Sequence, residues 1–246
     1  MKIWLLLGLF GCEMTPSFVD TKDIEQATAR GAWATVCKGL EMSEDRIRKY
    51  AAEQLWKNNA PQEEMKCICE HLPKNDGFDP AIAAGLTGLK NDAIAGCFAD
   101  LVKNPNLNKR EEAVVAFAKM TAPSVRPVLA EVAASDGDMA TRIRAATEIG
   151  GVPEHKDTLM SLLDHEDKSL RATAAKGLGG HKDKNIVNAL IKVASDDPEG
   201  SVRAAALVAV KTSGVSKAND MVCKAMLNDE SPAVREAAIR TLKGTR

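Results

Sequence analysis

The sequence predicts an all-α solenoid of about seven stacked helical hairpins. The second half of the 246-residue chain repeats one phrase four times: an aliphatic residue, an arginine, and small apolar residues at helical spacing. The copies start at Ile143-Arg144, Leu170-Arg171, Val202-Arg203 and Val234-Arg235, which places the arginines 27, 32 and 32 residues apart. A period near 32 residues is typical of one supersecondary unit stacked on itself. Stacked units usually bind partners along a surface rather than transform them in a pocket.

The composition agrees with closely packed helices and argues against a nucleic-acid partner. Hydrophobic residues make up 45% of the chain, but aromatic residues only 4%, because alanine supplies much of the apolar content. Surfaces that bind nucleic acids need excess positive charge and aromatic side chains, whereas the net charge here is −1. We therefore expect a protein partner and no nucleic acid.

The first eleven residues are predicted to be a secretory signal. Lys2 is followed by apolar residues from Ile3 to Phe10, a stretch far shorter than the roughly 20 residues that cross a membrane. Leu9-Phe10-Gly11-Cys12 resembles the lipobox of bacterial lipoproteins. The resemblance implies cleavage before Cys12 and lipid on its sulfur and its new amine. The alternative is a first buried helix with an isolated cysteine.

Residues 12–22 are predicted to be the lipidated cysteine and a flexible tether, because they show no helical period and contain Pro16. Several acyl chains on one residue would anchor the protein stably, which a single chain does not. We expect a protein that faces the periplasm of a bacterial cell envelope. Glu13, rather than the Asp that resembles an inner-membrane retention signal, favours the outer membrane.

Residues 23–246 are predicted to form the solenoid. The second helix of each unit carries the arginine phrase, and the first carries an aliphatic face such as Leu159, Leu162 and Leu163. Asp, Pro, Gly and Ser fill the turns, where they favour helix starts. The expected hairpins are 23–58, 59–90, 91–121, 122–153, 154–182, 183–214 and 215–246. The first three match the phrase less well: Ile47-Arg48 fits, residues 80–86 lack the arginine, and Arg110 is displaced.

This pattern resembles compact HEAT repeats of the kind found in phycobilisome-lyase-type proteins, a fold that implies a right-handed superhelix. Three times an Asp precedes the Arg by six residues, in Asp138/Arg144, Asp197/Arg203 and Asp229/Arg235. The HEAT resemblance implies that these residues form a ladder between successive repeats. The Asp164/Arg171 spacing is one residue longer, and the role of Asp164 stays open. The arginines could instead bind phosphate or carboxylate groups, but their acidic neighbours favour the ladder.

The cysteines predict disulfides if the chain is exported. Cys37, Cys67 and Cys97 are spaced by 30 residues, one repeat, and therefore occupy the same helix of successive units. Cys67 and Cys69 lie about 200° apart around a helix, so one faces the preceding repeat and the other the following one. We expect Cys37–Cys67 and Cys69–Cys97; the swapped pairing and five reduced core cysteines remain alternatives. Cys223 is expected to be a buried free thiol.

The sequence shows no motif for catalysis, a cofactor or a metal. Cys67 and His71 could share a helix face, but Cys69 cannot join them on one ion. His155, His165 and His181 fall in turns, where solvated side chains are expected, and Trp33 and Trp56 are expected to fill the core of the first unit or cap its open end rather than stack on a ligand. The predicted function is a non-catalytic protein-binding scaffold. The alternatives are an enzyme or accessory factor that acts on a bound small molecule, as the phycobilisome-lyase resemblance implies, and a purely structural component of an envelope complex.

Overall fold

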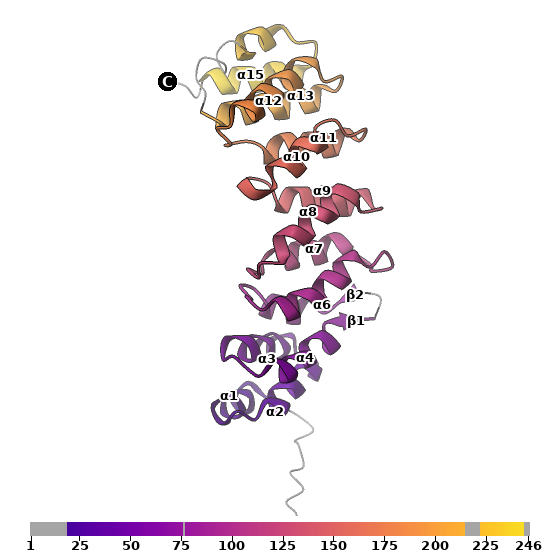
Figure 1. Cartoon of the computed structure of the whole chain (residues 1–246), viewed down its shortest axis with the longest axis vertical. Helices are drawn as coiled ribbons and strands as arrows, with labels where there is room; N and C mark the ends of the chain where they lie inside the picture. The colour runs from indigo at the N-terminus through magenta and orange to yellow at the C-terminus, as the bar shows by residue number, and fades with distance from the viewer. Residues whose placement is uncertain (1–18, 76, 215–221, 244–246) are drawn as a thin grey trace, which may run out of the picture.

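The computed structural model describes residues 19–75, 77–214 and 222–243. These residues form an elongated stack of helices that runs from the N-terminal to the C-terminal end of the chain (Figure 1). The α-helices are α1 (Thr21–Arg30), α2 (Trp33–Lys38), α3 (Asp45–Lys57), α4 (Gln62–His71), α5 (Pro80–Gly85), α6 (Asp92–Lys103), α7 (Arg110–Ala118), α8 (Val125–Ser135), α9 (Met139–Glu148), α10 (Lys156–Leu162), α11 (Lys168–Gly177), α12 (Lys184–Asp196), α13 (Gly200–Thr212) and α15 (Pro232–Lys243).

The helices pair into seven repeats, as the sequence predicts. Repeats 1 to 6 are α2/α3, α4/α5, α6/α7, α8/α9, α10/α11 and α12/α13, and repeat 7 joins the helical residues 222–228 to α15. We call the first helix of each pair the A helix and the second the B helix. Each B helix contacts the next, in an unbroken series from α3 to α15. The fold is therefore an all-α solenoid whose interior is shared between neighbouring repeats.

The solenoid begins earlier than residue 23. Helix α1 starts at Thr21, and Asp20 caps it by accepting hydrogen bonds from the backbone N–H groups of Lys22 and Asp23. Asp23 completes a reciprocal capping box, which fixes the helix start. Val19 is fully buried, so a tether that extends to residue 22 is wrong for its last four residues. The predicted signal and Cys12 lie outside the described residues.

Small residues let neighbouring B helices approach closely. A Cβ atom built on Gly150 would lie 3.2 Å from the Cα of Gly177, at the crossing of the C-terminal ends of α9 and α11. Ala145, Ala146 and Ala174 are fully buried at the same interface. The aliphatic A-helix face that the sequence predicts packs beneath them, with Leu159, Leu162 and Leu163 at most 4% exposed. The core is consequently a continuous layer between the A and B helices.

One feature of the described residues departs from an all-helical chain. Residues Pro73–Lys74 (β1) and Gly77–Phe78 (β2) pair as a two-residue antiparallel ladder in the turn between α4 and α5. This hairpin stands beside the stack rather than in its core (Figure 1). None of the helices in the described parts of the chain has the length and apolar content needed to cross a membrane.

Candidate binding surface

A single arginine in most repeats holds two turns together. Arg203, on α13, donates from Nη1 to the carbonyl oxygens of Asp197 and Pro198 in the A–B turn of its own repeat. Its Nε and Nη2 donate to the two carboxylate oxygens of Asp229, in the A–B turn of the next repeat, over 2.9 and 2.8 Å. Both side chains are less than 10% exposed. The guanidinium thus fixes one repeat against the next.

The same arrangement recurs along the stack and corrects the expected pairing. Arg171 and Arg203 each bind a carboxylate of the following repeat, whereas the residue six positions before the arginine, His165 or Asp197, contributes its carbonyl oxygen. Asp164 belongs to none of these contacts. The contacts between repeats are Arg48–Asp79 at 2.8 Å, Arg110–Asp136 at 2.6 Å, Arg171–Asp197 at 2.8 Å and Arg203–Asp229 at 2.8 Å, while Arg235 binds the carbonyls of Asp229 and Glu230.

The predicted pair Asp138/Arg144 is wrong. Arg144 is exposed, and Arg142 occupies the ladder position, donating to the carbonyl oxygens of Ala133 and Ala134. Asp138 instead caps α9 by accepting the Thr141 N–H over 2.8 Å. Thr141 is fully buried where the other repeats place an aliphatic residue before the arginine. The sequence reading was therefore out of register by two residues in this repeat.

His165 replaces the carboxylate at the contact between repeats 4 and 5. Its Nε2 lies 3.0 Å from Nη1 of Arg142, and its Nδ1 lies 3.0 Å from the backbone N–H of Asp167. Both neighbours are donors, but a neutral imidazole has only one acceptor nitrogen. One of the two contacts is consequently unsatisfied in either tautomer. At the equivalent positions, Asp197 and Asp229 can accept both hydrogen bonds. Each carboxylate accepts one from an arginine and one from the backbone N–H two residues later.

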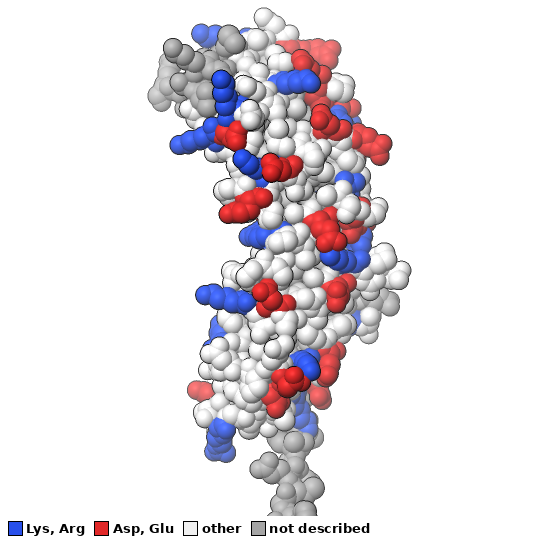
Figure 2. Space-filling view, in the orientation of Figure 1, with Lys and Arg blue, Asp and Glu red and all other residues white. Residues whose placement is uncertain are grey.

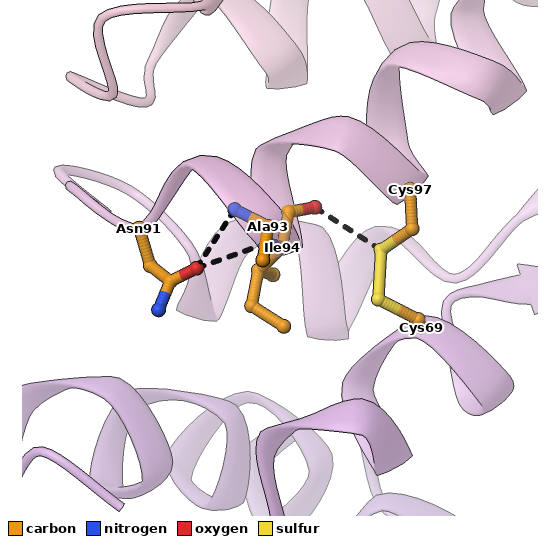
Figure 3. The surroundings of a disulfide bond; sticks show 5 residues. All are labelled: Cys69, Asn91, Ala93, Ile94 and Cys97. Atoms are coloured by element: carbon orange, nitrogen blue, oxygen red, sulfur yellow. Dashed lines mark hydrogen bonds between the residues drawn. A yellow bond between two sulfur atoms is a disulfide. The ribbon is translucent and has the colours of Figure 1, made fainter. Parts of the chain in front are cut away.

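Two disulfides join the A helices of the first three repeats. Cys37 on α2 pairs with Cys67 on α4, and Cys69 on α4 pairs with Cys97 on α6, with Cα–Cα separations of 5.9 and 5.8 Å. This is the first of the two pairings that the spacing allowed. Figure 3 shows the Cys69–Cys97 bond between the two helices. Each disulfide closes a loop of about 30 residues, which contributes about 3–4 kcal/mol in the chain-entropy model. Cys223 is buried and forms no disulfide.

The structure places His71 and His155 in different surroundings. His71 lies 3.9 Å from a Glu41 carboxylate oxygen, and the Cys67 beside it is in a disulfide. Contrary to the expectation of solvated turns, His155 is buried, and burial together with Arg126 lowers the pKa of its imidazole. Among the residues described, no three His, Cys, Asp or Glu side chains are grouped closely enough to hold a metal ion.

An open groove runs across the B helices of the C-terminal repeats. One part, of about 520 Å³, lies over α11, α13 and α15; another, of about 350 Å³, lies at the ends of α9 and α11. Lys176 lines both parts, so they adjoin. Small residues form the floor, and the side chain of Val208 rises from it with 47% of its surface exposed. We call this surface the B-helix groove; its lining includes Gly150, Thr173, Gly177, Ala204, Ala205, Ala233 and Ala237.

The charges of the groove are sparse and mainly basic. Lys176 has no ion pair within the described residues, whereas Arg240 pairs with Glu236 one turn away on α15. On the face of the molecule in Figure 2, acidic and basic side chains are mixed along the stack without an extended patch of one sign. The groove therefore combines an apolar floor with one unpaired positive charge. Sequence reasoning missed it, since its residues are not unusual until the helices place them together.

Comparison with known proteins identifies the repeats. The family described as HEAT repeats matches residues 129–211 and 187–245, the part of the chain that carries the regular ladder and the B-helix groove. Residues 129–245 therefore consist of HEAT repeats. No curated protein matches it.

Several solved structures resemble the stack. Human deoxyhypusine hydroxylase in complex with glycerol is 14% identical, with a TM-score of 0.42 over 90% of this chain and 88% of the other. An engineered protein is 17% identical, with a TM-score of 0.45 over 91% and 70%. The complex of CpcE and CpcF of phycocyanin lyase from Nostoc sp. PCC7120 is 17% identical, with a TM-score of 0.36 over 96% of both chains. At these scores none of the three informs function.

The ladder contact at His165 predicts a stabilising substitution. In His165→Asp, the new carboxylate can accept from both Arg142 and the Asp167 N–H, as Asp197 does in the next repeat. We expect the free energy of unfolding to rise by about 1 kcal/mol, measured by denaturant titration. Arg142→Ala serves as the second arm of a double-mutant cycle. If His165→Asp raised the free energy of unfolding equally in the Arg142→Ala background, the explanation through the ladder contact would be wrong.

The Arg203–Asp229 contact predicts a pH dependence of stability. Hydrogen bonds from Arg203 hold the pKa of Asp229 below its usual range, against the opposing effect of burial. Because the unfolded chain then binds more protons, this stability is present above about pH 3.9 and is lost as pH falls through the lower pKa of the folded chain. Asp229→Asn should cost about 3 kcal/mol at pH 7 and progressively less in acid.

The matched control for this pH dependence is Asp164→Asn, an exposed acid in an equivalent turn outside the ladder. In denaturant titrations from pH 7 to pH 2.5, the free energy of unfolding of this variant should change with pH in parallel with that of the unsubstituted chain. If Asp229→Asn lowered the free energy of unfolding by the same amount at every pH in this range, the ionised Asp229 carboxylate would not be the source of the stabilisation.

Proposed function

We propose that this protein is a non-catalytic scaffold that holds a protein partner in the B-helix groove. The partner offers an apolar segment that covers Val208 and an acidic group opposite Lys176. The scaffold is tethered through lipid on Cys12 to the bacterial cell envelope and faces the periplasm, with the outer membrane favoured by Glu13.

The observation that carries this proposal is an exposed apolar floor on a rigid surface. Val208 is the most exposed of the large hydrophobic residues in the described chain, at 47%, and it lines the groove together with alanines of α13 and α15. Exposed apolar surface with a polar rim is typical of protein interaction sites. Because each repeat packs on its neighbours, such a surface is preformed and binds without a large ordering cost.

The chemistry of the groove favours binding over catalysis. Its ionisable lining residues are Lys176, Glu236 and Arg240, and the last two neutralise each other. A reaction at this surface would need a nucleophile or an acid–base pair secluded from water. Action on a bound small molecule, the alternative that the lyase-type resemblance implies, gains no specific support from the groove.

The groove predicts that a charge at Val208 abolishes partner binding. Val208→Asp places a carboxylate on the apolar floor and should reduce partner capture at least tenfold, about 1.4 kcal/mol. Ile239→Asp is the matched control, because Ile239 is 42% exposed on α15 but does not line the groove. The measurement is quantitative pull-down from detergent-solubilised envelope. Equal capture by both variants, or loss with Ile239→Asp alone, would rule out the groove as the binding site.

The lipid anchor predicts the mature N-terminus. Mass spectrometry of the membrane-bound protein should identify an N-terminal peptide that starts at an acylated Cys12, because the signal is removed before that residue. Cys12→Ser should move the protein from the membrane to the soluble fraction while binding at the B-helix groove persists. An N-terminus that retains Met1 would refute the anchor and leave the groove proposal standing.

A further inference from the structure

A second hollow lies among the N-terminal repeats of the solenoid. It has a volume of about 490 Å³ and sits between the turns that follow α3 and α5. Trp56 at the end of α3 forms one wall, and residues 89–91, which lead into α6, form the other. This volume lies within the range of about 300–1,000 Å³ typical of small-ligand pockets. We call it the Trp56 pocket.

The floor of the Trp56 pocket is apolar and rigid. Ala60, Met65 and Leu89 line it, and each is at most 6% exposed because its remaining surface belongs to the core. The Trp56 ring is half-buried, and its indole Nε1–H donates to the carbonyl oxygen of Gly85 over 2.8 Å. That bond fixes the ring plane. The sequence predicts that Trp56 fills the core of the first unit or caps its open end; in the structure its ring packs against the core and also lines this pocket.

The charged residues around the pocket are both lysines, and Asn59 adds an uncharged amide. Lys57 and Lys90 stand on its rim, and no acidic residue lines it. The Lys57 Nζ lies 5.6 Å from the centre of the Trp56 ring and 3.3 Å from a Glu53 carboxylate oxygen outside the pocket. Lys90 is exposed and has no ion pair within the described residues. An anion that entered the pocket would therefore meet an uncompensated ammonium group.

Asn91 adds an oriented amide at the same rim. Its Oδ1 accepts from the backbone N–H groups of Ala93 and Ile94, which leaves its Nδ2 as a donor. Figure 3 shows Nδ2 turned away from the first turn of α6. The positive end of this 12-residue helix begins at the pocket and also favours a negative charge there. The only nearby acid of that turn, Asp92, is engaged with the N–H of Ser124.

The disulfides restrain the floor of the pocket relative to one of its walls. Cys37–Cys67 and Cys69–Cys97 fix α4, which carries the floor residue Met65, against α2 and α6. Residues 89–91 lead directly into α6, so the Cys69–Cys97 bond restrains them relative to Met65. A restrained lining loses little conformational freedom when it binds a ligand, which gives the disulfides a consequence beyond stability.

We propose that the Trp56 pocket binds a carboxylate attached to an apolar body. The apolar part packs on Trp56, Met65 and Leu89, and the carboxylate lies between Lys90 and the Asn91 amide, with Lys57 nearby. Such a group occurs in free aromatic or aliphatic acids and at the C-terminus of a polypeptide that ends in an apolar residue. The site goes beyond the proposed scaffold function and does not depend on the B-helix groove.

Calorimetric titration of the full-length protein tests this site with two acid–amide pairs. One pair is 3-phenylpropionate and 3-phenylpropionamide; the other is a hexapeptide that ends in Phe, with a free or an amidated C-terminus. At least one acid should bind, and its amide should bind at least tenfold more weakly. Binding of the small acid identifies a free acid as the ligand source, and binding of the peptide alone identifies a chain terminus. Failure of both acids, or equal binding of acid and amide, would overturn the proposal.

Variants and nuclear magnetic resonance locate the bound acid. Lys90→Gln should weaken binding about fivefold, because it removes an exposed charge partner without disturbing the fold. Lys192→Gln, which removes an exposed lysine from α12, should have no effect. Of the three indole N–H resonances, that of Trp56 should shift on binding. An unmoved Trp56 resonance, or unchanged affinity in Lys90→Gln, would place the ligand elsewhere and refute the site.

Discussion

The stack depends on a buried guanidinium that binds two turns at once. Burial of a charge is costly unless its partners are complete, and here the carbonyl oxygens of one turn and the carboxylate of the next supply them together. In Arg203 this satisfies donors on all three nitrogens of the guanidinium. A planar guanidinium donates hydrogen bonds in fixed directions. Each ladder arginine therefore specifies the rotation between neighbouring repeats as well as their contact. The shape of the whole surface follows from that repeated rotation.

The ladder is interrupted twice, and the two interruptions differ. The ladder arginine is the fourth residue of α3, α9, α11 and α13, but the fourth residue of α5 is Ala83. Asp79, which caps α5, pairs with Arg48, but repeat 2 has no guanidinium of its own to bind repeat 3. The Cys69–Cys97 disulfide joins those same repeats and replaces the missing contact. At His165 no covalent link compensates, and the contact keeps an unsatisfied hydrogen-bonding group instead.

The sequence predicts the repeat architecture well because small residues and arginines recur at one period. The disulfides follow from the same period, since cysteines one repeat apart share a helix. The repeated aliphatic–Arg motif alone could not predict the register of repeat 4. Ile143-Arg144 matches that motif, but the arginine that occupies the ladder position lies two residues earlier, at Arg142. The spacing indicates the correct register, because Arg110 and Arg142 are 32 residues apart, whereas Arg144 and Arg171 are only 27 residues apart. The groove and the Trp56 pocket were beyond prediction, because each is formed by residues that come together only when different repeats are stacked.

The contact at His165 links two repeats whose B helices line the proposed binding surface. The groove extends from the end of α9 to α15, and the Arg142–His165 contact is the ladder link between the repeats that contain α9 and α11. Gly150 and Gly177 bring those two helices together without intervening side chains, so a small rotation there changes the groove where Lys176 joins its two parts. A complete carboxylate link would hold that angle firmly. With histidine in its place, the interface that shapes the groove is held more by helix packing than by the ladder.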